Sequence, residues 1–183
     1  MVNVIIEVNN FWKLHETINS KLYFKGYLYS QTVSELNDIL NSIELEYLNE
    51  FINSLRGNFA FIFKNSKYTL GVVDKIRSSE LNFFQHKKDF YISPNISSIL
   101  NLDFFEKSIS NDALLQIAMS GYTIGDDTLY ENCKSLNAGQ YVLIVGEKIE
   151  IFDYFKYFDI LSKQSHDELK TELTEITLKV FKK

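Results

Sequence analysis

The sequence contains little cysteine, proline or glycine. Of its 183 residues, one is cysteine, one is proline and seven are glycine. A single cysteine, Cys133, cannot form an internal disulfide, and it excludes a Cys-x-x-Cys metal or redox motif. The scarcity of proline and glycine excludes collagen-like chains, flexible linkers and proline-rich recognition segments.

An excess of positive charge is also absent, as are long apolar runs. The formal net charge is -5 and basic residues are scattered, so we expect no nucleic-acid partner. No window approaches the roughly 18 consecutive apolar residues that a membrane-spanning helix needs. The first residues lack the basic and apolar regions of a signal peptide. We therefore expect no membrane partner and a cytoplasmic location.

Hydrophobic residues make up 45% of the chain and charged residues 23%, which is typical of a globular protein. Apolar runs separated by short polar turns predict many strands, most of them in hairpins. Spacings of three and four between apolar residues predict helices. Short turns favour antiparallel sheets covered by helices over a parallel βαβ fold. We predict strands at 2–8, 21–29, 59–63, 68–73, 81–84, 89–93, 140–145 and 149–154, and helices within 33–55, 110–121 and 166–182.

The C-terminal helix differs from the others. Ser165 and Glu168 form a Ser-x-x-Glu capping box at its start, and Leu169, Leu173, Ile176 and Val180 share one face. Such an apolar stripe needs a partner. Either the helix docks on the body of this chain, or it marks the start of a second domain.

Residue types alone do not identify an active site. His15, His86 and His166 are far apart in the sequence and lack the spacing of a metal site. Nothing beside Cys133 except Lys134 would lower the pKa of its thiol, so we expect a buried, inert cysteine. The adjacent carboxylates at 126 and 127 are more typical of a solvated loop than of a cation site. We expect no metal site.

Three segments, in order, nevertheless resemble the N-terminal glutaminase-type domain of the asparagine synthetase family. Residues 55–62 read Leu-Arg-Gly-Asn-Phe-Ala-Phe-Ile and are followed by the related run 72–84. Residues 90–100 are similar to the family's Phe-Ala-Ser-Glu-x-Lys-Ala-Leu-Leu. Residues 121–141, the most specific segment, resemble a run of Gly, Thr-Leu-Phe, Ile and Leu-Pro-x-Gly-His. The resemblance extends from about residue 20 to 182 and implies an Ntn-hydrolase-like αββα sandwich of two antiparallel sheets.

The sequence departs from the family pattern at the residues that catalyse glutamine hydrolysis. Class II glutaminases use an N-terminal cysteine as nucleophile and an Asn-Gly pair for the oxyanion. Here the second residue is Val2, and neither it nor Asn3 can act as nucleophile. Lys25-Gly26 aligns with the Asn-Gly pair, which places Lys25 where the oxyanion asparagine is expected. The segments that would hold the glutamine have no counterpart, so we expect no catalytic residues.

The resemblance implies a domain of a larger, ATP-dependent amide-forming ligase. We expect residues 1–158 to form the degenerate glutaminase-like domain, and residues 159–183 to connect it to a synthetase domain in cis or in trans. ATP and magnesium would bind only to that synthetase domain, and this chain itself would need no cofactor. Arg56 and Arg77 are candidates for structural ion pairs at the interface.

Two alternatives stay open. The chain can be a stand-alone regulatory module in which a vestigial pocket, beside Gly26 and Asn58, binds a small amino acid. A homodimer is compatible with either role. An exposed stripe on the tail helix would favour the ligase scaffold, and a fully buried tail helix would favour the stand-alone module. A still-active glutaminase would release ammonia from glutamine.

Overall fold

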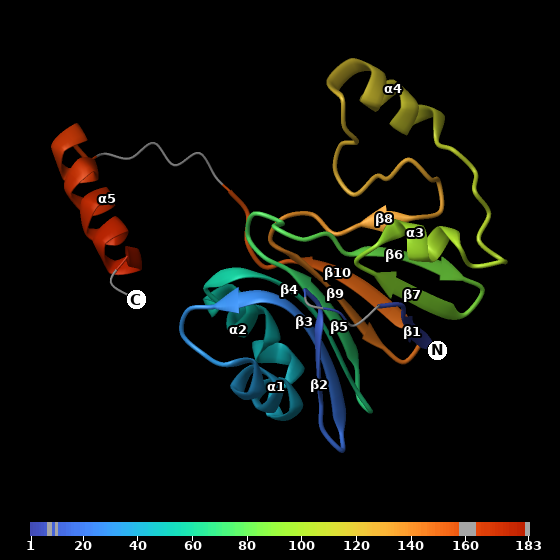
Figure 1. Ribbon diagram of the computed structural model, residues 1–183, viewed down its shortest axis with the longest axis horizontal. Coiled ribbons are helices and arrows are strands. Elements are labelled where there is room, and N and C mark those ends of the chain that lie inside the picture. Colours follow the sequence, from blue (N-terminus) through green and yellow to red (C-terminus); the bar gives the residue numbers. More distant parts are fainter. Residues whose placement is uncertain (7–8, 10, 158–163, 182–183) are drawn as a thin grey trace.

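The computed structural model describes residues 1–6, 9, 11–157 and 164–181. Two β-sheets lie face to face, with helices outside them (Figure 1). The larger sheet has six strands in the order β10-β9-β5-β4-β3-β2, and the smaller has four in the order β1-β7-β6-β8. The strands are β1 (Val2–Val4), β2 (Lys13–Glu16), β3 (Ser20–Leu28), β4 (Gly57–Asn65), β5 (Thr69–Val73), β6 (Asn82–His86), β7 (Asp89–Ser93), β8 (Lys134–Ser135), β9 (Gln140–Val145) and β10 (Lys148–Asp153).

Three helices cover the outer faces of the sandwich: α1 (Val33–Ser42) and α2 (Leu48–Ser54) on the larger sheet, and α3 (Ile96–Leu100) on the smaller. Alternation along the central strands sends Phe61 and Phe63 toward α1 and α2, and sends Ala60 and Ile62 toward the smaller sheet. The helix α3 packs on the outer face of the smaller sheet, against Phe84. The helices are α1 (Val33–Ser42), the 3-10 turn η1 (Leu45–Tyr47), α2 (Leu48–Ser54), α3 (Ile96–Leu100), α4 (Asn111–Ser120) and α5 (His166–Phe181).

The predicted α+β sandwich is confirmed, with one exception to its antiparallel sheets. All pairs in the larger sheet are antiparallel. In the smaller sheet, β1 pairs with β7 in parallel, with Val2 opposite Phe90. Residues so far apart in sequence pair only after the chain has folded. No short-range turn signal could have predicted this pairing.

Local capping signals fix the start of several helices. Thr32 caps α1 through a complete capping box with Glu35, and hydrogen bonding to Thr32 lowers the pKa of the Glu35 carboxyl. Ser110 caps α4, which ends at Gly121 in the left-handed conformation. Ser165 and Glu168 bond reciprocally at the start of α5. These three starts agree with the sequence-based prediction.

One buried carboxylate ties together three segments of the larger sheet. Asp74 follows β5, is 1% exposed, and its carboxylate accepts hydrogen bonds from the amides of Phe59, Ile76 and Ser78 at 2.9, 2.9 and 3.2 Å. The hydroxyl of Ser78 also donates to it. The main-chain carbonyl of Asp74 accepts from the amide of Gly139, just before β9. One residue thus holds the start of β4, the turn after β5 and the entry to β9.

We predict that Asp74→Asn destabilises the protein by about 2–4 kcal/mol, because an amide nitrogen cannot accept the bonds that the carboxylate accepts. Urea unfolding followed by circular dichroism measures the change in the free energy of unfolding. Asp103→Asn, at an exposed loop position, is the matched control and should stay within about 0.5 kcal/mol of wild type. Equal effects at both positions would contradict the role assigned to Asp74.

Candidate functional site

The structure places Gly26 and Asn58 side by side on neighbouring strands. Gly26 lies opposite Phe59 in the β3–β4 ladder, and Asn58 lies opposite Tyr27. Gly26 has a φ of 102°, and a Cβ at this position would lie 2.0 Å from the carbonyl oxygen of Asn58. Only glycine fits, because any side chain would collide with rigid backbone at a φ that other residues rarely adopt. The glycine inside the predicted strand therefore marks a close backbone approach.

The side chain of Asn58 bonds to Tyr27, which in turn contacts Tyr29. The hydroxyl of Tyr27 donates to its Oδ1 at 2.8 Å, and the hydroxyls of Tyr27 and Tyr29 lie 3.4 Å apart. The rings of these tyrosines meet edge to face. The hydrogen bond with Tyr29 raises the pKa of Tyr27 above its ordinary value. Asn58 thus has a local structural partner.

A cavity of about 620 Å³ lies beside Gly26 on β2, β3 and the start of α1. Asn58 is not among its lining residues, so the two predicted pocket residues do not share this cavity. The ionisable side chains in its lining are Lys13, His15 and Lys25. None of them carries negative charge, so among the described lining residues there is no carboxylate that could bind the ammonium group of an amino acid. The remaining lining residues are Phe11, Phe24, Gly26, Thr32, Val33 and Ser34.

The amino end of the chain lies elsewhere. The ammonium group of Met1 is 2.9 Å from the carboxylate of Asp89, in the β6–β7 hairpin, and the carbonyl of Val2 accepts a bond from Lys64 Nζ at 2.8 Å. Lys64 is opposite Lys21 in the β3–β4 ladder. Lys21 and Gly26 are five residues apart on β3, or about 17 Å. The strand β1 therefore starts at the opposite end of β3 from the Gly26 cavity.

The other candidate residues have structural contacts. Arg56 Nη1 donates to the carbonyls of Asn53 and Leu55, and Arg77 Nη2 donates to Ser135 Oγ at 2.8 Å. In the described part of the chain, neither guanidinium pairs with a carboxylate. His15 lies in β2, His86 ends β6 and His166 starts α5. Among the described residues, no three histidine, cysteine or acidic side chains gather as a metal site would require.

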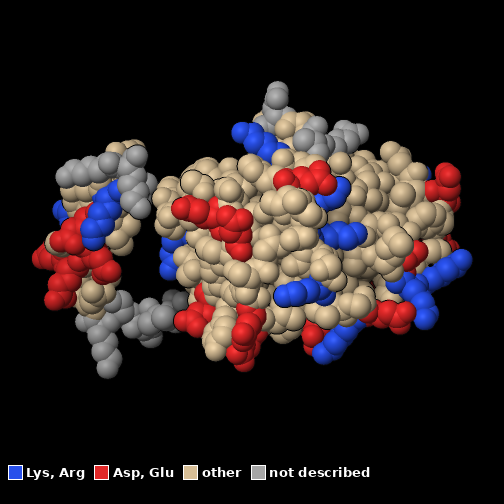
Figure 2. Space-filling view, turned by 90° about the horizontal axis from the view of Figure 1, so that it is seen from below, with Lys and Arg blue, Asp and Glu red and all other residues tan. Residues whose placement is uncertain are grey.

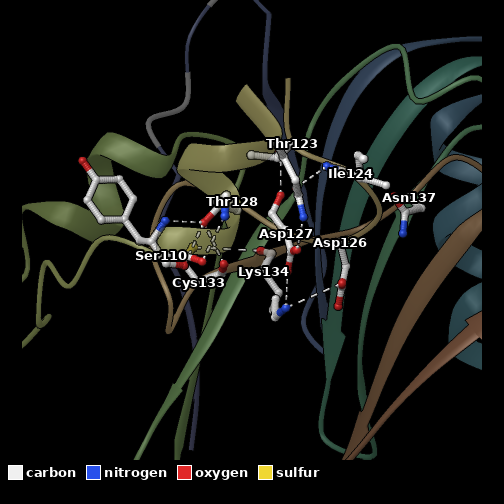
Figure 3. A network of polar contacts seen from close by, with 12 residues as sticks. Ser110, Thr123, Ile124, Asp126, Asp127, Thr128, Cys133, Lys134 and Asn137 are labelled. Atoms are coloured by element: carbon white, nitrogen blue, oxygen red, sulfur yellow. Dashed lines mark hydrogen bonds and ion pairs between the residues drawn. The ribbon is translucent and has the colours of Figure 1, made fainter. Parts of the chain in front are cut away.

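The adjacent carboxylates Asp126 and Asp127 both pair with a single lysine (Figure 3). Lys134 Nζ lies 2.7 Å from Asp127 Oδ1 and 3.6 Å from Asp126 Oδ1. Gln116 of α4 donates to Asp127 Oδ2 and accepts from the amide of Ile124. Hydrogen bonds from Lys134 and then Gln116 lower the pKa of Asp127. This network fastens the loop after α4 to β8, and the lysine takes the position that a cation would need.

Cys133 is fully buried next to this network. Burial raises the pKa of its thiol to about 11, despite an opposing hydrogen bond from Thr128. A catalytic cysteine requires the reverse, an exposed thiol with a lowered pKa. The geometry therefore agrees with an inert structural cysteine.

We predict that iodoacetamide alkylates Cys133 at least about a hundredfold more slowly in the folded protein than in 6 M guanidinium chloride at pH 8. Both burial and the scarcity of thiolate protect it. The rate is measured by mass spectrometry of quenched samples, with free glutathione as the control. Equal rates in the folded and unfolded protein would show that the thiol is accessible.

We also predict that Gly26→Ala destabilises the protein by about 3 kcal/mol or more, because the new Cβ meets backbone. Gly146→Ala is the matched control. It also has a positive φ, 62°, but nothing lies within 4 Å of the added Cβ, so it should cost only about 1 kcal/mol. Thermal unfolding of the two variants gives the comparison. A smaller loss for Gly26→Ala than for Gly146→Ala would contradict the close approach.

Two solved structures are similar to part of this chain. Among solved structures, the glutamine phosphoribosylpyrophosphate amidotransferase of B. subtilis, complexed with ADP and GMP, matches 82% of this chain and 32% of its own, with 11% identity and a TM-score of 0.49. An allosteric regulatory enzyme of purine biosynthesis matches 83% of this chain and 32% of its own, with 11% identity and a TM-score of 0.43. The chain thus spans about a third of the length of these two proteins.

A search of curated proteins gives no match. Among the described residues, no helix combines the length and apolar character needed to cross a bilayer. The sequence family that matches is described as a glutamine amidotransferase domain, and the match runs over residues 5–155, well over half of the chain. The chain therefore belongs to the glutamine amidotransferase domain family.

Proposed function

We propose that this chain is a non-catalytic glutamine amidotransferase-like domain that serves as scaffold in an asparagine-synthetase-like, ATP-dependent amide-forming ligase. The observation that carries the proposal is the cavity beside Gly26. Its ionisable lining residues are all basic, and Lys25 aligns with the oxyanion asparagine of the family. An amide nitrogen held in place stabilises an oxyanion by a directed bond. A lysine at this position, without a nucleophile beside it, does not restore glutamine hydrolysis.

The amino end supports the same conclusion. Val2 and Asn3 carry no thiol or hydroxyl, and the ammonium group of Met1 lies 2.9 Å from the carboxylate of Asp89. The only thiol of the chain, Cys133, is buried against α3 and Phe84 in the smaller sheet's outer cluster. The proposal therefore takes the nucleophile, the oxyanion donor and a carboxylate anchor for glutamine to be lost together.

The role of scaffold is supported by α5, which stands away from the sandwich in two views (Figures 1 and 2). Leu169, Leu173 and Ile176 are 41%, 66% and 51% exposed. An apolar stripe of this kind on a capped helix is suited to pack against another domain. We propose that this other domain is the synthetase, in cis or in trans.

ATP and magnesium belong, in this proposal, to the synthetase and not to this chain. Among the described residues there is no group of three acidic or histidine side chains. The glycines 121 and 125 follow a helix and lack the lysine of a phosphate-binding loop. No step of the reaction is assigned to these glycines.

A stand-alone binding module is the second candidate function. The observation that favours it is the volume of the Gly26 cavity, about 620 Å³, which lies in the range of small-molecule sites. The exposed stripe of α5 favours the scaffold instead.

We test the scaffold role by immunoprecipitation from the native source, followed by intact mass spectrometry. The proposal expects a polypeptide well above 21.4 kDa, or an ATP-dependent ligase subunit that co-purifies with the chain. A native mass of 21.4 kDa without such a subunit would contradict it and favour the stand-alone module.

We predict that Leu173→Asp changes the free energy of unfolding of the 183-residue chain by less than about 0.5 kcal/mol, because this side chain is exposed. In the native ligase the same substitution should reduce co-purification or amide synthesis by about tenfold or more. Thr174→Asp, also exposed on α5, adds the same charge beside the stripe and is the matched control. A large loss of stability in the isolated chain would mean that α5 packs on its own body.

A further inference from the structure

A second cavity, unrelated to Gly26, opens between the two sheets. It has a volume of about 460 Å³ and is bounded by β1, the β2–β3 hairpin and the end of β4. No residue of the Gly26 cavity lines it. Its lining residues are Val2, Asn3, Val4, Glu16, Thr17, Ile18, Asn19, Ser20, Lys21, Tyr23, Lys64 and Asn65.

Two lysines face each other across this cavity's floor. Lys21 and Lys64 are directly opposite in the antiparallel β3–β4 ladder, where like charges are destabilising. Lys21 pairs with Glu16 at 2.8 Å. Lys64 has no carboxylate partner in the described residues, and its bond to the carbonyl of Val2 uses one of its three N–H donors. The lining therefore carries two positive charges and one negative, a net charge of +1.

Apolar surface lies next to this unmatched charge. Val2, Val4 and Tyr23 pack against the core between the sheets and also line the cavity. Ile18, fully exposed at the tip of the β2–β3 hairpin, lies at the rim. A ligand that matches the positive charge of Lys64 and the apolar surface beside it has one negative charge and a short apolar tail.

The rim of the cavity is held in place without a ligand. Ser20 is 4% exposed, donates to Asn37 Oδ1 and accepts from Asn41 Nδ2, both on α1. The hydroxyl of Thr17 accepts from the amide of Ser20. The hairpin is thus fastened to the helix layer, so a ligand would not have to order it on binding.

We propose that this cavity binds a small monocarboxylate with an apolar tail. The carboxylate pairs with Lys64, and the tail lies against Val4 and Tyr23. The inference does not depend on the proposed scaffold function, since the two cavities share no lining residue and the adjacent residues Tyr23 and Phe24 line them from opposite faces of the larger sheet.

The test is a titration of the full 183-residue chain with sodium hexanoate at constant ionic strength, followed by ¹H–¹⁵N NMR. We expect saturable shifts centred on β1, the 16–21 hairpin and Lys64. Lys64→Met should weaken binding by about tenfold. Lys67→Gln, which removes an exposed lysine in the β4–β5 turn that does not line the cavity, should leave the affinity unchanged.

Because Lys64→Met also removes the bond to Val2, a second variant avoids any change in the fold. Ile18→Glu places a carboxylate at the fully exposed rim and should weaken hexanoate binding about threefold by charge repulsion. Hexylamine, with the same tail and opposite charge, should not bind. No saturable shifts with hexanoate would overturn the proposal. Equal binding of inorganic phosphate, or hexanoate binding unchanged by both Lys64→Met and Ile18→Glu, would overturn it as well.

Discussion

The buried carboxylate of Asp74 is the interaction on which the rest of the structure depends. A charge with 1% exposure is tolerated because three amides and one hydroxyl surround it. These donors come from the start of β4 and from the turn after β5, the two central strands of the larger sheet. The carbonyl of the same residue fixes the entry to β9. The chain therefore leaves β5 for β6 of the smaller sheet through a turn that these hydrogen bonds hold in place.

The core between the two sheets is separate from the Gly26 cavity. The core between the sheets is formed by residues such as Ile62, Val73 and Ile92, and none of them lines the Gly26 cavity. The half-buried Lys25 belongs to neither of the two core clusters on the faces of the larger sheet. We propose that this chain retains the glutamine amidotransferase fold as a docking surface, after the loss of its catalytic groups.

Much of the fold could be predicted from the sequence because its signals are local. Alternating apolar residues and polar turns located the hairpins, and the Ser165–Glu168 capping box located the start of α5. The strand β2, residues 13–16, was missed because Lys-Leu-His-Glu has weak strand propensity and forms only by pairing with β3. The parallel pairing of β1 with β7 is equally non-local.

The candidate site was accessible to sequence reasoning only in part. Gly26 could be singled out because a glycine inside a strand signals a close approach. Asp74 gave no such signal, since a lone aspartate after a strand is usually part of a solvated turn. The cavity beside Lys64 could not be foreseen, because it arises where β1 meets a hairpin from the other sheet.

The central claim, an amidotransferase fold without glutaminase chemistry, is tested most directly by measuring ammonia release from glutamine. The purified chain is incubated with saturating glutamine, and ammonia is quantified against an enzyme-free blank and an active glutaminase. The account predicts no release above the blank. Release that scales with the concentration of this chain and saturates with glutamine would contradict it.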